Sequence, residues 1–155
     1  NNTLAAHMNY VYDYIEENHP NAKLAVMSYS PIYNQIPGGT SDLDVMAEEY
    51  HCDRRQIRAV IGPSISQDAY EVDLPVLERF REAFAFADAI IAPVDENHGR
   101  VDLWEANRRQ LLEAGLLPEH IEVSGLCTFQ NHETFFSHRA GGGTTGRNAA
   151  MLMLV

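Results

Sequence analysis

The sequence contains little cysteine and no long apolar run. Its 155 residues include two cysteines, Cys52 and Cys127, and no Cys-x-x-Cys pair. Two thiols cannot build a disulfide scaffold, so we exclude the class of small disulfide-rich secreted proteins and expect a cytoplasmic location. No apolar stretch approaches the roughly 20 residues of a membrane-spanning helix, so we expect no membrane partner.

Positive charge is scarce relative to negative charge. Lysine and arginine total 11 against 22 aspartates and glutamates, which gives a formal net charge of −11. Such a field repels the phosphates of nucleic acids, and the only adjacent arginine pairs are Arg54/Arg55 and Arg108/Arg109. We therefore expect no nucleic-acid partner.

What remains is the composition of an ordinary globular domain. Hydrophobic residues make up 45% of the chain, and its length suffices for one core. The first residue is Asn1 rather than Met, so we expect a processed, trimmed or partial chain. With no repeat or linker in the sequence, residues 1–155 are predicted to form a single domain.

Hydrophobic spacing and capping residues predict alternating helices and strands. Asp73 and Asp102 are expected N-caps, and Gly115 is expected to end a helix. The fold class predicted from this order is α/β (α+β), a layered sandwich with a mixed β-sheet flanked by helices. The expected helices cover residues 4–15, 43–50, 75–86 and 103–114, and the expected strands cover residues 23–30, 57–61, 89–92, 121–123 and 149–155.

A turn rich in glycine and hydroxyl groups follows the predicted strand at residues 57–61. Residues 62–67 read Gly-Pro-Ser-Ile-Ser-Gln. Backbone N–H groups in such a turn can hold an anion, but no lysine follows, so this is not a P-loop. On the motif alone, a simple turn that ends a strand is the favoured interpretation.

A second loop carries two arginines around a run of glycines. Arg139 and Arg147 bracket residues 141–146, Gly-Gly-Gly-Thr-Thr-Gly. Guanidinium groups bind carboxylates or phosphates through paired hydrogen bonds. An anionic ligand and a solvated surface loop are equally compatible with this pattern.

Cys127, His132 and His138 are candidate metal ligands, and Cys127 is also a candidate nucleophile. Their spacing is Cys-x4-His-x5-His. Zinc requires ligands that converge on one point, and a nucleophile requires a base within hydrogen-bonding reach. A buried thiol beside two histidines in turns is the favoured interpretation, because free cysteine is most often a core residue.

Five segments occur in one order along the chain: residues 62–72, 101–107, 125–128, 133–139 and 145–147. Together they resemble the YfiH-type polyphenol oxidase or laccase-like family over roughly residues 52–150. The resemblance implies a compact α/β sandwich, a bound zinc, and phosphorolysis of adenosine, inosine and methylthioadenosine with an adenosine deaminase side activity. The implied partners are a small nucleoside and phosphate, and the tyrosine-rich first predicted helix is compatible with a homo-oligomer.

The resemblance also implies roles for individual residues. Arg139 and Arg147 would hold phosphate or ribose oxygens, while Ser64 and Gln67 would hydrogen-bond the substrate. Phe135 and Phe136 would flank the base.

The family's His-Cys-His zinc ligands are not found in the sequence. Residues 36–40, Ile-Pro-Gly-Gly-Thr, stand where the family has His-Ala-Gly-Trp-Arg-Gly, and residues 1–35 show no match. The catalytic residues therefore stay unassigned. Two alternatives remain open: a non-catalytic relative or fragment that binds a nucleotide or a protein partner, and an unrelated binding module.

Overall fold

The computed structural model describes residues 42–148. The predicted elements at residues 4–15, 23–30 and 149–155 lie outside this range. The α-helices are α2 (Asp42–Glu48), α3 (Leu74–Ala83), α4 (Ala87–Ile90) and α5 (Leu103–Glu113). The strands are β1 (Ala59–Ile61), β2 (Glu71–Asp73), β3 (Ile91–Pro93), β4 (His98–Val101) and β5 (Ile121–Val123). Short 3-10 helices are η2 (Arg54–Gln56), η3 (Gln67–Ala69) and η4 (Pro118–His120).

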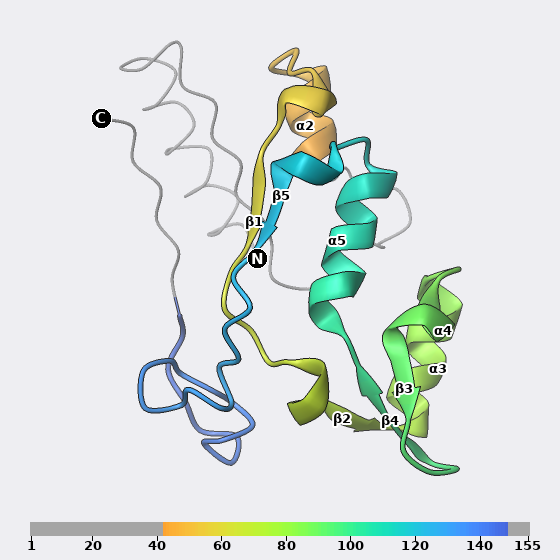
Figure 1. Ribbon diagram of the computed structural model, residues 1–155, viewed down its shortest axis with the longest axis vertical. Helices are drawn as coiled ribbons and strands as arrows, with labels where there is room; N and C mark the ends of the chain where they lie inside the picture. The colour runs from red at the N-terminus through yellow and green to blue at the C-terminus, as the bar shows by residue number, and fades with distance from the viewer. Residues whose placement is uncertain (1–41, 149–155) are drawn as a thin grey trace.

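The strands form two sheets within the described range. β1 and β5 pair in parallel, with Ala59 opposite Ile121 and Ile61 opposite Val123. β2, β4 and β3 form an antiparallel sheet in that order. The two sheets lie toward opposite ends of the long axis in Figure 1. The α/β class with flanking helices is confirmed, and the structure adds that parallel and antiparallel pairing occur in separate sheets here.

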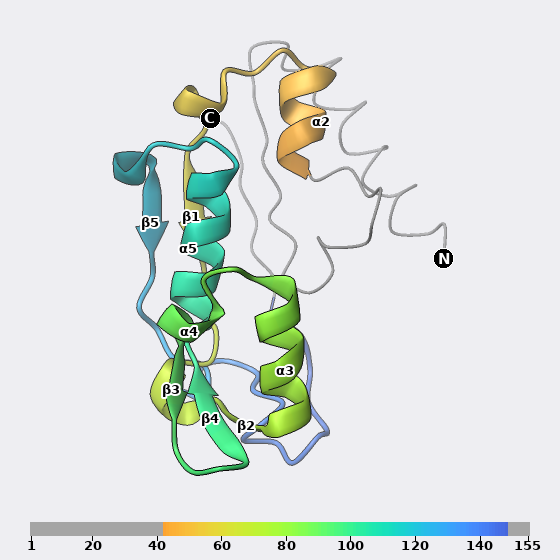
Figure 2. The same ribbon diagram turned by 90° about the vertical axis from the view of Figure 1, so that its right-hand side faces the viewer.

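Helix α5 connects two hydrophobic clusters. Its Leu111 packs in a first cluster with residues of α2 and β1, and its Ala106 packs in a second cluster with residues of α3, α4 and β4. Figure 2 shows α5 running along the parallel strands, with α3 and α4 nearer its amino end. The largest fully buried side chains are Phe80, Ile90, Leu111, Val101 and Cys127.

The predicted N-caps are confirmed. The Asp73 carboxylate accepts a hydrogen bond from the Val76 backbone N–H at the start of α3. The Asp102 carboxylate accepts one from the Glu105 N–H at the start of α5. Gly115 has a φ of 98°, the left-handed conformation that ends α5. Local side-chain chemistry therefore fixes where both long helices begin.

Several boundaries differ from the prediction by a few residues, and at two places the kind of element differs. Residues 89–92 were expected to form one strand, but Ala87–Ile90 form the single turn α4 and only Ile91–Pro93 form β3. His98–Val101 form strand β4, in a stretch that was not among the expected strands. β4 exists because it pairs with β2 on one side and β3 on the other, a contact that its own polar sequence does not indicate.

Within residues 42–148, no helix combines the length and the apolar character that crossing a bilayer requires.

Candidate functional site

The candidate site lies where β1 and β5 end. Because these strands are parallel, their carboxyl ends meet at one edge, the usual position of ligand sites in open parallel sheets. The segments that follow stay paired: the Ser64 N–H donates to the Leu126 carbonyl at 3.2 Å, and the Thr128 N–H donates to the Ser64 carbonyl at 3.0 Å. Figure 1 shows both strand arrows pointing toward this edge. We call the paired segments 62–67 and 124–128 the polar edge.

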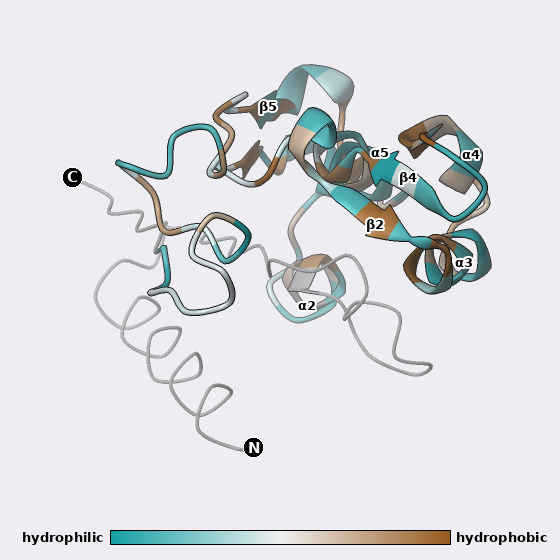
Figure 3. Ribbon diagram, turned by 90° about the horizontal axis from the view of Figure 1, so that it is seen from below, coloured by the Kyte–Doolittle hydropathy of each residue, from teal (hydrophilic) through white to brown (hydrophobic). Residues whose placement is uncertain are grey.

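The polar edge buries hydroxyl groups. The buried polar residues of the described chain are Ser64, Ser66, Thr128 and Ser137, which lie in the polar edge or in the loop after it. Seen from below, this loop, residues 129–148, is mostly teal and white, with short brown segments (Figure 3). Burying a hydroxyl is unfavourable unless it finds a hydrogen-bond partner. The hydrogen-bond partners of these hydroxyl groups therefore indicate which of them are satisfied within the protein.

Ser64 is fixed by a residue from another part of the fold. The indole Nε1–H of Trp104 donates to the Ser64 Oγ at 2.6 Å. Trp104 sits in the first turn of α5, where its ring packs against the first hydrophobic cluster. Docking of α5 on β1 therefore places the indole over the serine.

Cys127 is the sulfur acceptor of the polar edge. The Ser66 Oγ–H and N–H both donate to the Cys127 Sγ, at 3.1 and 3.3 Å. Burial raises the pKa of the Cys127 thiol. The two donors of Ser66 and the backbone N–H groups of Gln130 and Phe129 lower that pKa further than burial raises it. The favoured sequence interpretation of Cys127 as a buried thiol is thus confirmed, with 2% of its surface exposed.

The three candidate metal ligands are not brought together. The His132 Nδ1 lies 3.1 Å from the Phe129 carbonyl oxygen, and its Nε2 lies 3.5 Å from the Glu133 carboxylate. His138 is exposed, with its carbonyl accepting from the Gly143 N–H. Within residues 42–148, no group of three His, Cys, Asp or Glu side chains could hold a metal ion. Within the described range, Cys127, His132 and His138 therefore do not form a ligand set that fits zinc.

Gln67 contacts the second hydrophobic cluster through a hydrogen bond to Ile90. Its Nε2 donates to the Ile90 carbonyl at 3.3 Å, and its side chain is half-buried. This bond joins the residue at which the polar edge ends and η3 begins to the end of α4. Gln67 thus has a structural partner at the place where substrate contact was predicted.

Arg139 connects the loop of residues 129–148 to β2. Its Nη1 donates to the Glu71 carbonyl at 3.0 Å, and its guanidinium carbon lies 5.5 Å from the centroid of the Tyr70 ring. Among residues 42–148, no carboxylate pairs with this guanidinium. An exposed guanidinium anchored in this way can still hold an anion with its remaining N–H groups.

Arg147 turns back on its own loop. Its Nη1 donates to the Gly146 carbonyl at 3.0 Å and to the Thr145 carbonyl at 3.4 Å. Within the described chain, Arg139 and Arg147 thus contact different carbonyls, Arg139 on β2 and Arg147 on the loop itself. The predicted pair of arginines does not share a partner in this structure.

The two phenylalanines differ in exposure. Phe135 is half-buried, whereas 57% of the Phe136 surface is exposed. The Phe136 backbone is held by Asn148, whose amide donates to the Phe136 carbonyl at 2.9 Å and accepts from its N–H at 3.0 Å. A Cβ added at Gly146 would lie 2.8 Å from the Phe136 ring, so the ring lies directly over this glycine.

Sequence reasoning did not assign functional roles to Ser66, Thr128 or Trp104. Ser66 was visible as the second hydroxyl of the Gly-Pro turn, and Thr128 as the residue after Cys127. Trp104 is the single tryptophan of the chain, and its spacing of 40 residues from Ser64 gives no local signal. Only the packing of α5 brings it to the polar edge.

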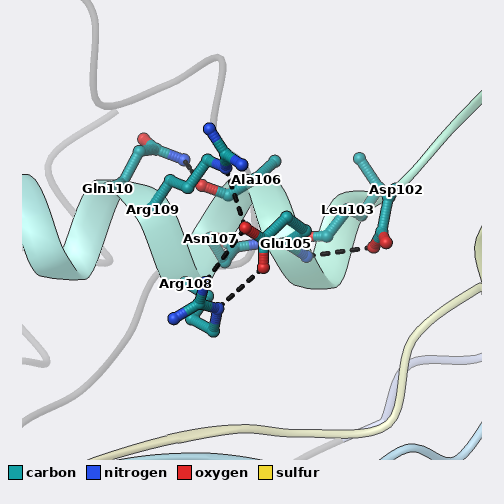
Figure 4. Close-up of polar contacts among 8 residues, drawn as sticks. All are labelled: Asp102, Leu103, Glu105, Ala106, Asn107, Arg108, Arg109 and Gln110. Carbon is teal, nitrogen blue, oxygen red and sulfur yellow. Dashed lines mark hydrogen bonds and ion pairs between the residues drawn. The ribbon is translucent and has the colours of Figure 1, made fainter. Parts of the chain in front are cut away.

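Helix α5 carries a partly exposed ion-pair cluster, drawn in Figure 4. Glu105 binds Arg108 through two hydrogen bonds, of 2.7 and 3.1 Å, and Arg109 through one of 2.8 Å. The Arg108 hydrogen bond lowers the pKa of Glu105 most strongly, and Glu105 in turn raises the pKa of Arg108. Both guanidinium groups of this arginine pair are thus bound to a carboxylate of their own helix.

Comparison with known proteins gives consistent matches. "Purine nucleoside phosphorylase YlmD" of Bacillus subtilis (strain 168) is 44% identical over 91 residues, which is 59% of this chain and 33% of that protein. "Adenosine deaminase RL5", from an unknown prokaryotic organism, is 38% identical over 93 residues, which is 59% of this chain and 36% of that protein. The chain thus spans about a third of the length of these relatives.

A solved structure and a family profile agree with these relatives. The crystal structure of YlmD from Geobacillus stearothermophilus superposes with a TM-score of 0.61 and 36% identity, over 67% of this chain and 39% of that one. The profile described as "Multi-copper polyphenol oxidoreductase laccase" matches residues 36–155, most of this chain. The resemblance drawn from the five sequence segments is therefore confirmed: the chain belongs to the multi-copper polyphenol oxidoreductase laccase family, the YfiH-type laccase-like proteins.

Proposed function

We propose that this chain binds purine nucleosides and phosphate and takes part in phosphorolysis, with the polar edge as one wall of the site. Two lines of support meet here. Relatives carry the names purine nucleoside phosphorylase and adenosine deaminase, and both names describe proteins that act on purine nucleosides. The loops that match the family are also those that gather the buried hydroxyls and the exposed guanidinium groups.

The observation that carries the proposal is the polar edge itself. Hydroxyls of Ser64 and Ser66 are buried at the carboxyl ends of parallel strands, where a fold of this class places its ligands. The neighbouring loop supplies Arg139, a guanidinium whose assigned contacts are a carbonyl and a ring, neither of which neutralises it. It also supplies the exposed Phe136 ring, a surface on which a base can stack.

We propose the following roles at this wall. Ser64 and Gln67 hydrogen-bond the substrate, Arg139 and Arg147 hold phosphate or ribose oxygens, and Phe135 and Phe136 flank the base. Phosphate is a strong acceptor for guanidinium groups, so Arg139 is expected to contribute most to phosphate affinity. Gln67 and Arg147 would have to exchange their present carbonyl partners for the ligand.

The test is release of hypoxanthine from inosine in the presence of inorganic phosphate. Arg139→Gln is expected to raise the KM for phosphate at least about tenfold, because hydrogen bonds to charged groups contribute about 1.5–3 kcal/mol. Arg58→Gln, which changes an exposed arginine next to β1, serves as the matched control and is expected to leave the KM unchanged. Phosphate-dependent release that is absent in the parent chain at high protein concentration would remove the proposal.

A specific observation favours one second candidate, a non-catalytic relative that binds a nucleotide or a protein partner. Within residues 42–148, no group of three His, Cys, Asp or Glu side chains could hold a metal ion. Calorimetric titration with inosine together with elemental analysis of the purified protein separates the two candidates. Binding heat without metal or turnover supports the non-catalytic relative, whereas zinc with phosphate-dependent turnover supports the enzyme.

A further inference from the structure

We propose that Trp104 is a positioning residue that orients the Ser64 hydroxyl as a hydrogen-bond donor. This part of the site therefore binds an oxygen or ring nitrogen of the ligand that can accept a hydrogen bond. The inference rests on the proposed function, because it names what the same wall recognises. Trp104 is an additional residue of the site, because it lies on α5 rather than in the loops and is not one of the predicted substrate contacts.

The hydrogen bond between the two side chains determines the direction of the Ser64 O–H. An indole N–H can only donate, so at 2.6 Å it occupies a lone pair of the Ser64 Oγ. A serine hydroxyl has one proton and two lone pairs. With one lone pair taken by the indole, the hydroxyl proton points away from Trp104 and is available to a third group.

Both partners are held in place by the fold. The Trp104 ring packs against the first hydrophobic cluster, and its helix begins at the Asp102 cap two residues earlier. The Ser64 backbone is paired on both sides, with the Leu126 carbonyl and the Thr128 N–H. A donor whose direction is fixed before the ligand arrives requires little reorganisation on binding.

The neighbouring hydroxyl does not compete for the same role. Ser66 donates its proton to the Cys127 Sγ, so this proton already has an acceptor. For the Ser64 proton, residues 42–148 provide no assigned acceptor, although only 8% of the Ser64 surface is exposed. A nearly buried donor without an acceptor calls for one from a ligand.

Two ligands of the proposed reaction can supply the acceptor. Inorganic phosphate offers anionic oxygens, and inosine offers a carbonyl and ring nitrogens. Calorimetric titration with each compound alone distinguishes them, using the parent chain, Ser64→Ala and Trp104→Phe. Loss of one neutral hydrogen bond is expected to weaken binding about three- to tenfold. We expect Ser64→Ala and Trp104→Phe to weaken the binding of the same compound by a similar factor.

Trp104 also provides its own spectroscopic signal, because it is the only tryptophan in the chain. We expect the bound compound to change the Trp104 emission in the parent chain and to change it much less in Ser64→Ala. A second replacement, benzothienylalanine at position 104, keeps the ring shape and removes only the N–H. The benzothienylalanine chain replaces Trp104→Phe in the test if thermal unfolding shows that the Trp104→Phe chain is not folded.

The outcomes separate the two proposals. If the parent chain binds neither phosphate nor inosine, the proposed function fails and this inference fails with it. If the parent chain binds and Ser64→Ala loses affinity, while the two changes at position 104 do not, the proposed function stands and the role of Trp104 is overturned. Equal losses for Ser64→Ala and the benzothienylalanine chain support the inference.

Discussion

The second hydrophobic cluster and the polar edge are both buried, but they are built from opposite chemistry. Phe80, Ile90 and Val101 of the cluster are at most 1% exposed and carry no polar side-chain atom. The polar edge buries Ser64, Ser66 and Thr128 at 5–9% exposure. Apolar burial stabilises a fold without further conditions, whereas buried hydroxyls need partners. The cluster is thus the part that stabilises this end of the molecule, and the polar edge is the part that we propose for recognition.

The largest expected effect comes from the apolar region. Phe80→Ala removes a fully buried ring that lies 6.0 Å from the Phe84 ring, centroid to centroid. We expect the free energy of unfolding to fall by about 3–5 kcal/mol, because the ring leaves a cavity. Denaturant unfolding measures this change. The matched control is Phe136→Ala, an exposed ring, for which a change within about 0.5 kcal/mol is expected. Equal losses at both positions would contradict the contrast between the regions.

The polar edge is expected to respond mainly through chemistry. Ser66→Ala removes the hydroxyl donor to the Cys127 Sγ but leaves the backbone donor. We expect the pKa of Cys127 to rise and the free energy of unfolding to fall by about 1 kcal/mol, the typical net contribution of one hydrogen bond. The thiolate absorbance during a pH titration reports the pKa, in a Cys52→Ala background so that a single thiol is observed. An unchanged pKa of Cys127 would show that the Ser66 hydroxyl does not lower it and that the backbone donors account for the lowering.

Helix α5 joins the two regions, and its partly exposed ion pairs are expected to matter less. The pKa of Glu105 is lowered from its usual value of 4.5, first by the Arg108 hydrogen bond. Because the folded-state pKa is depressed, this stabilisation is present above pH 4.5 and is lost as the pH falls through the folded-state pKa. Glu105→Gln is expected to reduce the free energy of unfolding at neutral pH by about 0.2–1 kcal/mol, since the pairs are partly exposed.

Comparing unfolding at neutral pH and well below pH 4.5 measures the Glu105 contribution, and the difference between the parent chain and Glu105→Gln should shrink in acid. Glu113→Gln, on the same helix at an exposed position, is the control. A difference that grew as the pH fell would contradict the assigned sign.

The smallest stability effect is expected at Gly146. An added Cβ would lie 2.8 Å from the Phe136 ring. The ring is exposed and can move, so Gly146→Ala is expected to change the free energy of unfolding by less than about 0.5 kcal/mol. If Phe136 stacks on the base, the same change weakens inosine binding measurably by calorimetry. A loss of stability without a change in inosine binding would place Phe136 among structural residues.

Part of the site could be read from local patterns. The Gly-Pro turn, Cys127 and the loop with Arg139 were all identified, because each carries its signal within a few residues. The placement of Arg139 on Tyr70 and the Glu71 carbonyl was not, since it joins segments 68 residues apart. The roles assigned to Ser64, Gln67, Phe135, Phe136, Arg139 and Arg147 stay predictions, as does the homo-oligomer, whose proposed helix at residues 4–15 lies outside the described range.

By itself, the sequence determined the α/β class, the starts of α3 and α5, and the family. These depend on caps, hydrophobic spacing and motif order, all of which act over short stretches of chain. Tertiary structure alone decided that β4 is a strand and that Trp104 meets Ser64. It also decided that Cys127, His132 and His138 do not converge. A polar strand gains its hydrogen bonds only from neighbours, and side chains meet only after the helices pack, so neither outcome is written in local sequence.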